Sequence, residues 1–299
     1  MSSYFHIINS DVNNIILSYL DSNEVFIYMK TFILTNVNWS TVFAYKTGTY
    51  LHVDGVKYPA ELKKYELNVI RDVFNLTLMN NIFELKRLNT IVIPYKISIT
   101  RIPDEIGVLT NLIKLSIIHN NIKEIPSSIS KLINLKFLDL SDNVIEELPE
   151  SMSELLNLTE LTLDRNRIKK LVLPKNLQIL NSVNNQIRVL PKSIGKLSNL
   201  RILNLASNHI KEISPEIYYL TNLVTLNLSN NKFLTKVPDE IGYLTNLTNL
   251  NLSYNPINEL PDGVLNLPKL KFLDLRFTNI KSIDILSDRV KSGSLIINY

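Results

Sequence analysis

The residue types that most often perform catalysis are present in this chain, but they are scattered. The seven glycines do not cluster, so the sequence contains neither a phosphate-binding loop nor a dinucleotide fingerprint. Without cysteine the chain cannot form disulfides, thiolate metal sites or thioesters. The four histidines show no H-E-x-x-H pair and no zinc-ligand spacing: His6, His52, His119 and His209. We therefore expect no enzyme activity, no cofactor and no metal, and we look for a binding function.

The composition indicates a folded chain with a small positive charge. Of 299 residues, 45% are hydrophobic and 20% charged, which excludes collagen-like, disulfide-stapled and wholly disordered chains. The net charge of +4 is small and no Lys/Arg-rich run occurs, so we do not expect a nucleic-acid partner. The charges are unevenly distributed: residues 137–164 hold eight acidic and no basic residues, and residues 165–201 hold nine basic and no acidic ones.

The first residues predict a chain that stays in the cytoplasm, with the nucleus also open. The stretch from Met1 to Asp11 has no basic n-region and no long apolar run, so it is a poor signal peptide. No segment reaches the roughly 18 consecutive apolar residues that a membrane span needs, so we expect no membrane association.

Self-similarity is the strongest signal in the sequence. From Leu112 the chain reads L-x-x-L-x-L/I-x-x-N-x-I-x-x-I/L-P-x-x-I-x-x-L-x-N, and successive repeats begin 23, 23, 19, 23, 23, 24 and 23 residues apart. The repeats begin at Leu112, Leu135, Leu158, Leu177, Leu200, Leu223, Leu247 and Leu270. Eight of the twelve prolines share one phase of this pattern, which chance composition does not produce.

Each repeat predicts one strand, one turn and one short return segment. The alternating apolar residues of Leu138-x-Leu140 are typical of a strand with one buried face. The I-x-x-L spacing after the proline suits one turn of helix or 3₁₀ helix, and a single repeat can bury its leucines only by stacking on others. An inward asparagine at the turn can donate to and accept from neighbouring backbone. This predicts an asparagine ladder of Asn120, Asn143, Asn166, Asn185, Asn208, Asn231 and Asn255.

These residues resemble the leucine-rich repeat proteins, and the form L-x-x-L-x-L-x-x-N-x-I-x-x-L-P-x-x-I is similar to the intracellular repeats of Ras-suppressor-type proteins. The resemblance covers about residues 102–283. It implies an α/β fold: a right-handed leucine-rich repeat solenoid with a parallel β-sheet on its concave face, here preceded by a small helical N-terminal region. It also implies protein recognition as the usual activity.

Two departures from the repeat pattern lie close together. The repeat that begins at Leu158 is only 19 residues long, because the segment from Leu171 to Leu177 omits most of the outer helical turn. The next repeat places Ser182 where a leucine is expected. A buried hydroxyl costs free energy unless it is hydrogen-bonded, so we expect a weaker core at this point.

The N-terminal region lacks the repeat and is predicted to be helical. Residues 8–25 align without a gap with the opening of an F-box, the helical motif by which substrate receptors dock on the Skp1 adaptor of cullin ubiquitin ligases. The resemblance implies a Skp1-type adaptor as a partner and assigns adaptor docking to Ile16, Leu17, Leu20, Val25 and Trp39. Two positions depart from the motif: Asn9 replaces the usual proline, and the interval from Val25 to Trp39 is a few residues long.

A second interpretation of this region stays open: its helices cover the apolar end of the first repeat and nothing more. The predicted organisation is a helical region, F-box-like or cap, at 1–72; degenerate first repeats at 73–100; leucine-rich repeats at 101–283; and a C-terminal cap at 284–299.

Function is then expected on the concave face, where the residues between the leucines point outward. We predict a non-enzymatic, monomeric chain that binds a protein partner there, as a ligase substrate receptor or as a stand-alone scaffold or signalling regulator. Aromatic residues and Arg dominate interface energetics. The candidate contacts are Lys114, His119, Phe137, Asp139, Glu160, Asp164, Arg165, Ile202, Tyr254, Phe272, Arg276 and Phe277. A second candidate is the basic run that contains Lys169, Lys170, Lys192 and Lys196, which would suit an acidic partner or simply face solvent.

Overall fold

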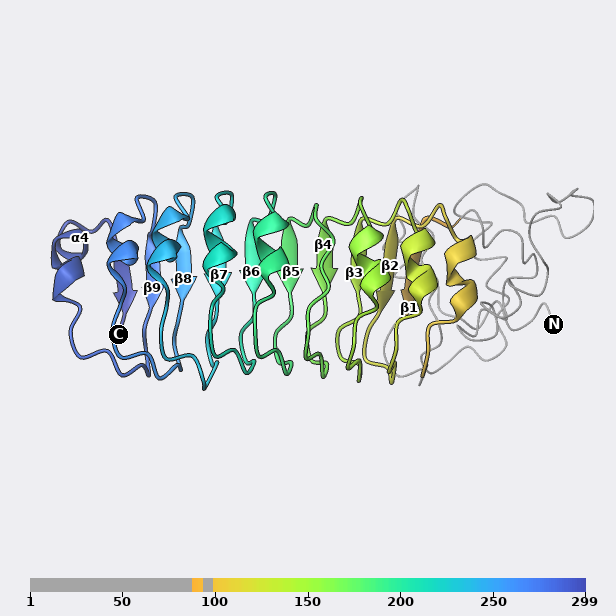
Figure 1. Cartoon of the computed structure of the whole chain (residues 1–299), viewed down its shortest axis with the longest axis horizontal. Helices are drawn as coiled ribbons and strands as arrows, with labels where there is room; N and C mark the ends of the chain where they lie inside the picture. Colours follow the sequence, from red (N-terminus) through yellow and green to blue (C-terminus); the bar gives the residue numbers. More distant parts are fainter. Residues whose placement is uncertain (1–87, 94–98) are drawn as a thin grey trace, which may run out of the picture.

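The described residues form one continuous stack of repeats. The computed structural model describes residues 88–93 and 99–299, and in this part ten strands pair in sequence order into a single sheet (Figure 1). Each pairing is parallel and in register, so equivalent residues of successive repeats lie side by side. The strands are β1 (Thr90–Ile93), β2 (Lys114–Ile117), β3 (Phe137–Asp139), β4 (Glu160–Thr162), β5 (Ile179–Asn181), β6 (Ile202–Asn204), β7 (Thr225–Asn227), β8 (Asn249–Asn251), β9 (Phe272–Asp274) and β10 (Ile296–Asn298).

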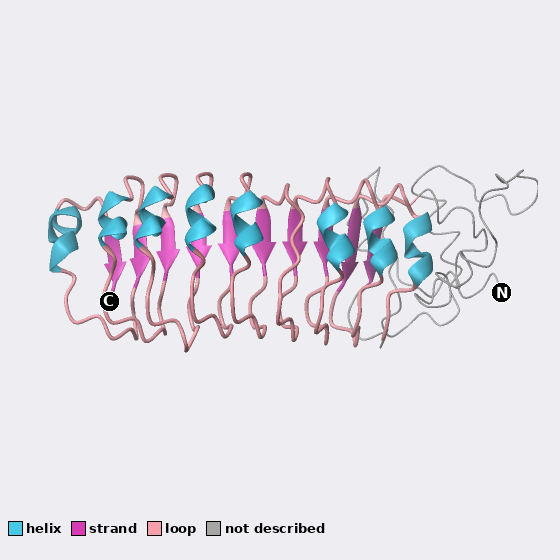
Figure 2. Cartoon of the chain, viewed as in Figure 1, coloured by secondary structure: helices cyan, strands magenta, loops and turns pink. Residues whose placement is uncertain are grey.

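Short 3₁₀ helices form a second layer on the other side of the stack (Figure 2). They are η2 (Asp104–Val108), η3 (Ser127–Lys131), η4 (Glu150–Glu154), η5 (Lys192–Lys196), η6 (Pro215–Tyr219), η7 (Asp239–Tyr243), η8 (Asp262–Asn266) and η9 (Asp284–Leu286). The prolines of the repeat set the start of this layer: in six of these helices the residue just before the first turn is the repeat proline, with φ between −74° and −66°. Because proline fixes φ near −65°, it ends the preceding extended segment and opens the turn.

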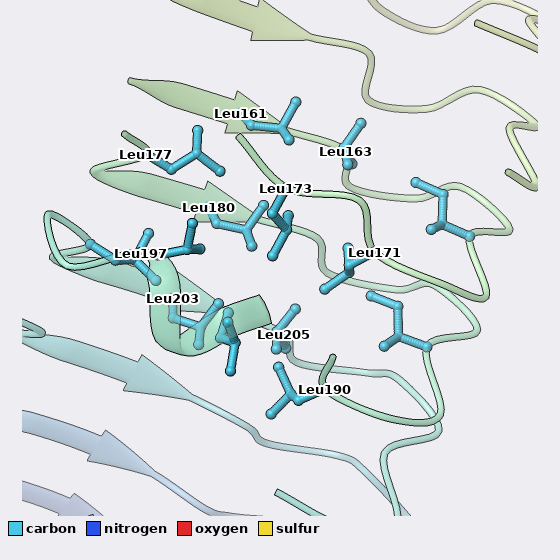
Figure 3. Close-up of a cluster of buried hydrophobic side chains, with 14 of the residues drawn as sticks. Leu161, Leu163, Leu171, Leu173, Leu177, Leu180, Leu190, Leu197, Leu203 and Leu205 are labelled. Carbon is cyan, nitrogen blue, oxygen red and sulfur yellow. The ribbon is translucent and has the colours of Figure 1, made fainter. Parts of the chain in front are cut away.

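The leucines of the repeat fill the space between the two layers. Figure 3 shows part of this core around β4 to β6, where Leu161, Leu180 and Leu203 occupy the same position of successive strands. All three are fully buried. The core is one continuous cluster from Leu88 to Leu295, because no single repeat encloses its own apolar side chains.

The helix layer is interrupted at the short repeat, as its 19-residue length predicts. No helix lies between β4 and β5 in the described structure, and the gap between η4 and η5 is visible in Figure 2. Residues 171–174 run there as an irregular segment whose side chains are all buried. Leu171 and Leu173 lie in the same cluster as Leu163 and Leu180 (Figure 3). Two leucines thus fill the core where the other repeats use a helical turn.

The C-terminal end of the stack carries η9, a short helix α4 (Ser287–Lys291) and the last strand, β10. The guanidinium of Arg289 donates to the carbonyl oxygens of Leu267 and Leu270 at 2.9 and 2.8 Å. These two carbonyls flank the start of the last repeat at Leu270, so one arginine ties the terminal helix to the end of the solenoid.

The F-box-like positions Ile16, Leu17, Leu20, Val25 and Trp39 lie outside the described residues, as does the whole predicted region 1–72. Of the predicted first repeats at 73–100, the structure describes residues 88–93, 99 and 100, with β1 at Thr90–Ile93. In the described part of the chain, no helix is long and apolar enough to cross a membrane.

Candidate binding surface on the sheet face

The solvent-facing side of the sheet, which we call the sheet face, presents two rows of side chains from the strands. The first residue of each strand forms one row, in which Lys114, Phe137 and Glu160 are direct cross-strand partners. The same row continues through Ile179, Ile202, Thr225, Asn249, Phe272 and Ile296. The third residue of each strand forms the second row, which is polar from Ser116 and Asp139 through Asn204 to Asp274. The leucine between the two rows points into the core.

A third row follows directly after the strands and has an unusual backbone. One residue per repeat has a positive φ between 52° and 58°: His119, Asp142, Arg165, Asn184, Ser207, Asn230, Tyr254 and Phe277. We call these eight residues the αL row. Asn and Asp tolerate this left-handed conformation, but bulky L-residues are uncommon there because the β-carbon crowds the backbone. Arg, Tyr and Phe therefore occupy these positions at a conformational cost.

At the β2–β4 end, the αL row carries an ionic cluster. Asp142 accepts two hydrogen bonds from the guanidinium of Arg165, and Nε2 of His119 lies 3.5 Å from the same carboxylate. The hydrogen bonds from Arg165 lower the pKa of Asp142, and the charges of Arg165 and His119 act in the same direction. Asp139, Asp142, Glu160 and Asp164 bring four carboxylates to this end, against two fixed cations, Lys114 and Arg165. This part of the sheet face is therefore acidic.

The pKa of Asp164 shifts in the opposite direction to that of Asp142. Burial raises the pKa of its carboxyl, a hydrogen bond from the backbone N–H of Val183 at 2.7 Å opposes that rise, and the charges of Asp139 and Asp142 add to it. The carboxylate thus fixes the loop of the next repeat while it remains costly to ionise.

At the β8–β9 end, the αL row carries an aromatic pair. The rings of Tyr254 and Phe277 stack with centroids 4.4 Å apart and planes inclined by 20°. Phe277 remains 71% exposed and Tyr254 49%, and Phe272 and Ile296 of the first row are also exposed. Arg276 pairs with Asp274 at 2.6 Å, and its hydrogen bonds lower the pKa of that carboxyl. An apolar, aromatic surface therefore lies at the opposite end of the sheet from the acidic cluster.

The structure places all twelve predicted contact residues on or beside these three rows. Asp164 and Arg276 directly precede the αL row, and Ile202 lies between the two ends, where its cross-strand partner is Ile179. The acidic end gathers Lys114, His119, Phe137, Asp139, Glu160, Asp164 and Arg165. The aromatic end gathers Tyr254, Phe272, Arg276 and Phe277.

The repeat architecture agrees with comparisons to known proteins. Models of the leucine-rich repeat region match residues 163–253, and leucine-rich repeat models match residues 110–168 and 246–267. The chain is a leucine-rich repeat protein. Proteins of this family generally mediate protein–protein interaction, and their fold is typically a non-enzymatic binding scaffold. Among curated proteins no sequence matches this chain.

Solved leucine-rich repeat structures share the fold over much of the chain. A leucine-rich repeat protein of Leptospira interrogans is 34% identical over 71% of this chain, with a TM-score of 0.64. A plant peptide hormone receptor, solved in complex with its hormone, is 33% identical over 65% of the chain, with a TM-score of 0.59. A Toll-like receptor 13 structure with single-stranded RNA is 30% identical over 64%, with a TM-score of 0.57. The chain spans 54%, 33% and 29% of these proteins, respectively.

The asparagine ladder of this leucine-rich repeat solenoid is buried and bonded. All seven predicted residues, Asn120, Asn143, Asn166, Asn185, Asn208, Asn231 and Asn255, are at most 8% exposed. In Asn143, for example, Oδ1 accepts from the N–H of Ile122 at 3.0 Å and Nδ2 donates to the carbonyl of Ile117 at 2.7 Å. In the last repeat, which begins at Leu270, Thr278 takes the ladder position, and its hydroxyl donates to the carbonyl oxygen of Leu275 in the same turn. Each carboxamide thus joins adjacent repeats.

A second amide ladder was not foreseen from the sequence. In five repeats the asparagine just before the first leucine donates a side-chain hydrogen bond of 2.7–2.9 Å to a backbone carbonyl one repeat earlier. These residues are Asn134, Asn157, Asn176, Asn222 and Asn246. The signal was present, because the repeat pattern ends in L-x-N with the same period. Unlike the first ladder, these hydrogen bonds are exposed to solvent.

Part of the basic run serves to pair repeats. Lys169 forms an ion pair with Glu146, and Lys170 forms one with Glu150; each joins neighbouring repeats with an N–O distance of 3.0 Å. The acidic and basic segments of the sequence therefore face each other, one repeat apart. Since all four side chains are at least half exposed, these pairs contribute little stability. Among the described residues, no three His, Cys, Asp or Glu side chains form a group that could hold a metal ion.

Proposed function

We propose that this chain is a non-enzymatic binding protein that recognises a protein partner on its sheet face. The observation that carries the proposal is the stacked pair of Tyr254 and Phe277. Both rings are exposed and both backbones adopt the left-handed conformation, which asparagine or glycine would adopt at lower cost. Other repeats fill the same position with Asn or Ser, whereas protein interfaces are enriched in aromatic side chains.

The two ends of the sheet face define the chemistry of that partner. Four carboxylates around β2 to β4 favour basic groups, and the aromatic end around β8 and β9 favours apolar ones. A protein segment that reaches both ends would cross about five strand spacings, or roughly 24 Å. We infer an elongated partner segment with a basic part and an apolar part.

Affinity capture with point variants tests this proposal. The double variant Tyr254→Ser/Phe277→Asn introduces residue types that already stand in the αL row, at Ser207 and Asn230, so it should remain folded. Phe233→Asn is the matched control, because Phe233 is 52% exposed and contacts His209 and Lys211 away from the αL row. Proteins recovered with the wild-type chain should be lost with the double variant and retained with the control. Recovery of the same proteins with all three chains would contradict the proposal.

A more specific proposal is that the chain is an F-box-type substrate receptor of a cullin ubiquitin ligase, acting in the cytoplasm or nucleus. Its support is the gapless resemblance of residues 8–25 to an F-box. In the full chain, Leu20→Asp should then abolish micromolar binding to a Skp1-type adaptor, and Leu62→Asp, outside the motif, should not. Absence of adaptor binding by the wild-type chain would reject this role.

The alternative is a stand-alone scaffold or signalling regulator of the Ras-suppressor kind, in which residues 1–72 serve only as a cap. Capture of the partner should then be unchanged by Leu20→Asp, and no ligase subunit should be recovered with the wild-type chain. The same capture experiment therefore separates the two roles.

A further inference from the structure

A groove runs along the edge of the solenoid where the strands begin, beside the first row of the sheet face and at the opposite end of the strands from the αL row. It encloses about 610 Å³. Its lining residues come from four successive repeats: Gln178, Asn199, Arg201, Asn222, Val224, Asn246, Thr248 and Lys269. We call it the strand-start groove. Five of its eight residues carry amide or hydroxyl groups, and the only charged ones are Arg201 and Lys269.

Carboxylates are missing from this edge of the described repeats. The edge consists of the two residues before the first leucine of each repeat and the residue after it. From Thr110 to Lys271 these positions hold no Asp or Glu and five cations: Lys136, Lys175, Arg201, Lys269 and Lys271. Elsewhere the cations of this chain often face acids of the adjacent repeat, as in the Lys169–Glu146 pair. The edge is therefore consistently positive.

Three polar side chains at one end of the groove are left without protein partners. Within residues 88–93 and 99–299, the side chains of Gln178, Asn199 and Arg201 make no hydrogen bond or ion pair. Asn199 breaks the second amide ladder, whose members on either side, Asn176 and Asn222, are both bonded. Asn199 is the last residue of the repeat that follows the shortened one. Two carboxamides and a guanidinium fork thus remain available together.

The other end of the groove is ordered by the ladder itself. Nζ of Lys269 donates to Oδ1 of Asn246 at 2.7 Å, and Nδ2 of Asn246 donates to the carbonyl of Thr221 at 2.8 Å. These bonds hold the ammonium group at the edge. Arg201 and Lys269 are three strand spacings apart, which corresponds to about 14 Å.

We propose that the strand-start groove is a second binding site, which takes an extended acidic peptide segment. An extended chain advances about 3.4 Å per residue, so residues i and i+4 are about 14 Å apart and point to the same side. One carboxylate accepts both N–H groups of the Arg201 fork, and the second pairs with Lys269. The amides between them match peptide N–H and C=O groups, which need both acceptors and donors.

The groove fits a nucleic acid less well. No aromatic residue lines it, whereas single-stranded nucleic acids are usually held by stacking on aromatic rings. Its two cations are also far apart for a chain that carries a charge on every unit. A peptide with two separated acidic groups matches both features.

Binding of a defined peptide to the full chain tests the proposal. The probe is a short fluorescein-labelled Ser/Gly peptide with glutamates at i and i+4, measured by fluorescence polarisation at low ionic strength. The dissociation constant should be below about 1 mM. Placing the glutamates at i and i+3, on opposite sides of the extended chain, should weaken binding, and replacing both with glutamine should abolish it.

Variants locate the binding site. Arg201→Gln/Lys269→Gln should weaken binding by about tenfold or more, because it removes both charge-assisted pairs. Lys123→Gln/Lys281→Gln removes the same net charge from exposed positions elsewhere and should change binding by less than about twofold. An equal loss in both double variants would show a general charge effect and overturn the proposal, as would no loss in either.

Two further measurements separate this site from its alternatives. Tyr254→Ser/Phe277→Asn should bind the probe normally, since the αL row is not part of the groove. Loss of binding in that variant would place the peptide on the αL row and overturn the second site. Oligothymidylate should bind more weakly than the peptide. Tighter binding of oligothymidylate that is lost in Arg201→Gln/Lys269→Gln would assign the groove to a nucleic acid and overturn the peptide assignment.

Discussion

The hydroxyl of Ser182 accepts a hydrogen bond from Nδ2 of Asn185 at 3.1 Å, at a position where every neighbouring repeat has a leucine or isoleucine. Ser182 is completely buried. In other repeats the ladder asparagine donates to the carbonyl of that leucine, as Asn143 does to Leu140 at 3.0 Å. In this repeat the side-chain oxygen takes the place of the carbonyl. The expected weakness of the core at Ser182 is therefore reduced, because the hydroxyl is paired.

Replacing Ser182 with alanine should lower the free energy of unfolding by about 0.5–1.5 kcal/mol, the usual worth of one hydrogen bond. The loss stays small because Asn185 keeps its bond to the carbonyl of Leu163 at 2.9 Å. Urea titration followed by circular dichroism measures it. A variant as stable as the wild type, or more stable, would show that the hydroxyl contributes nothing to the ladder.

Asn208→Ala should cost about 1–3 kcal/mol, because it leaves buried backbone groups unpaired. Its Oδ1 accepts from Ile187 at 3.0 Å, and its Nδ2 donates to the carbonyl of Ser182 at 2.7 Å. Asn222→Ala is the matched control: its single bond, to the carbonyl of Ser198, is exposed, and water can replace it. Equal losses in the two variants, measured in urea, would contradict the distinction between the two ladders.

Asp164→Asn should leave the chain as stable as the wild type, or more stable, near neutral pH. Burial raises the pKa of Asp164 above its ordinary value of 3.8. The stability that this raised pKa gives the folded state is therefore fully present below pH 3.8, and it is lost as the pH rises through the folded-state pKa. Asparagine removes the cost of ionisation and keeps an oxygen for the N–H of Val183.

Asp142→Asn should show the opposite pH dependence. Arg165 lowers the pKa of Asp142, so this carboxylate stabilises the fold above 3.8, and its contribution is lost as the pH falls through the folded-state value. Unfolding curves at neutral pH and at about pH 3 should show the stability gap between Asp142→Asn and wild type closing in acid. A gap that does not change with pH would mean that the Arg165 pair contributes no stability.

Gly263→Ala should destabilise the helix layer by about 1–3 kcal/mol, because an added methyl group would overlap the backbone of Asp239 in the neighbouring turn. Gly107→Ala is the comparison: the nearest atom there is Cδ of the flexible Lys131, at 2.8 Å, and the nearest backbone atom is the oxygen of Ser128 at 3.0 Å, against 2.1 Å for the oxygen of Asp239 at Gly263. Thermal unfolding should show a larger decrease for Gly263→Ala. A similar small effect in both would show that the backbone between η7 and η8 adjusts.

The period of the sequence determined most of the fold. The fixed spacing of the leucines predicts the strand order. The prolines in one phase predict the outer turns, and one turn asparagine per repeat predicts the buried ladder. A stacked solenoid repeats the same local contacts at every step, so local patterns determine its architecture. The missing outer turn after Leu158 also followed from the 19-residue interval.

The tertiary structure decided how side chains from different repeats meet. The stack of Tyr254 on Phe277, the bond from Asn185 to Ser182 and the unpaired trio of Gln178, Asn199 and Arg201 each depend on the register between neighbouring turns. Residues 17–23 positions apart, such as Asp142 and Arg165, become neighbours only when the turns stack. A single sequence identifies the residues at each position, but their distances and burial arise from the packing of one repeat on the next.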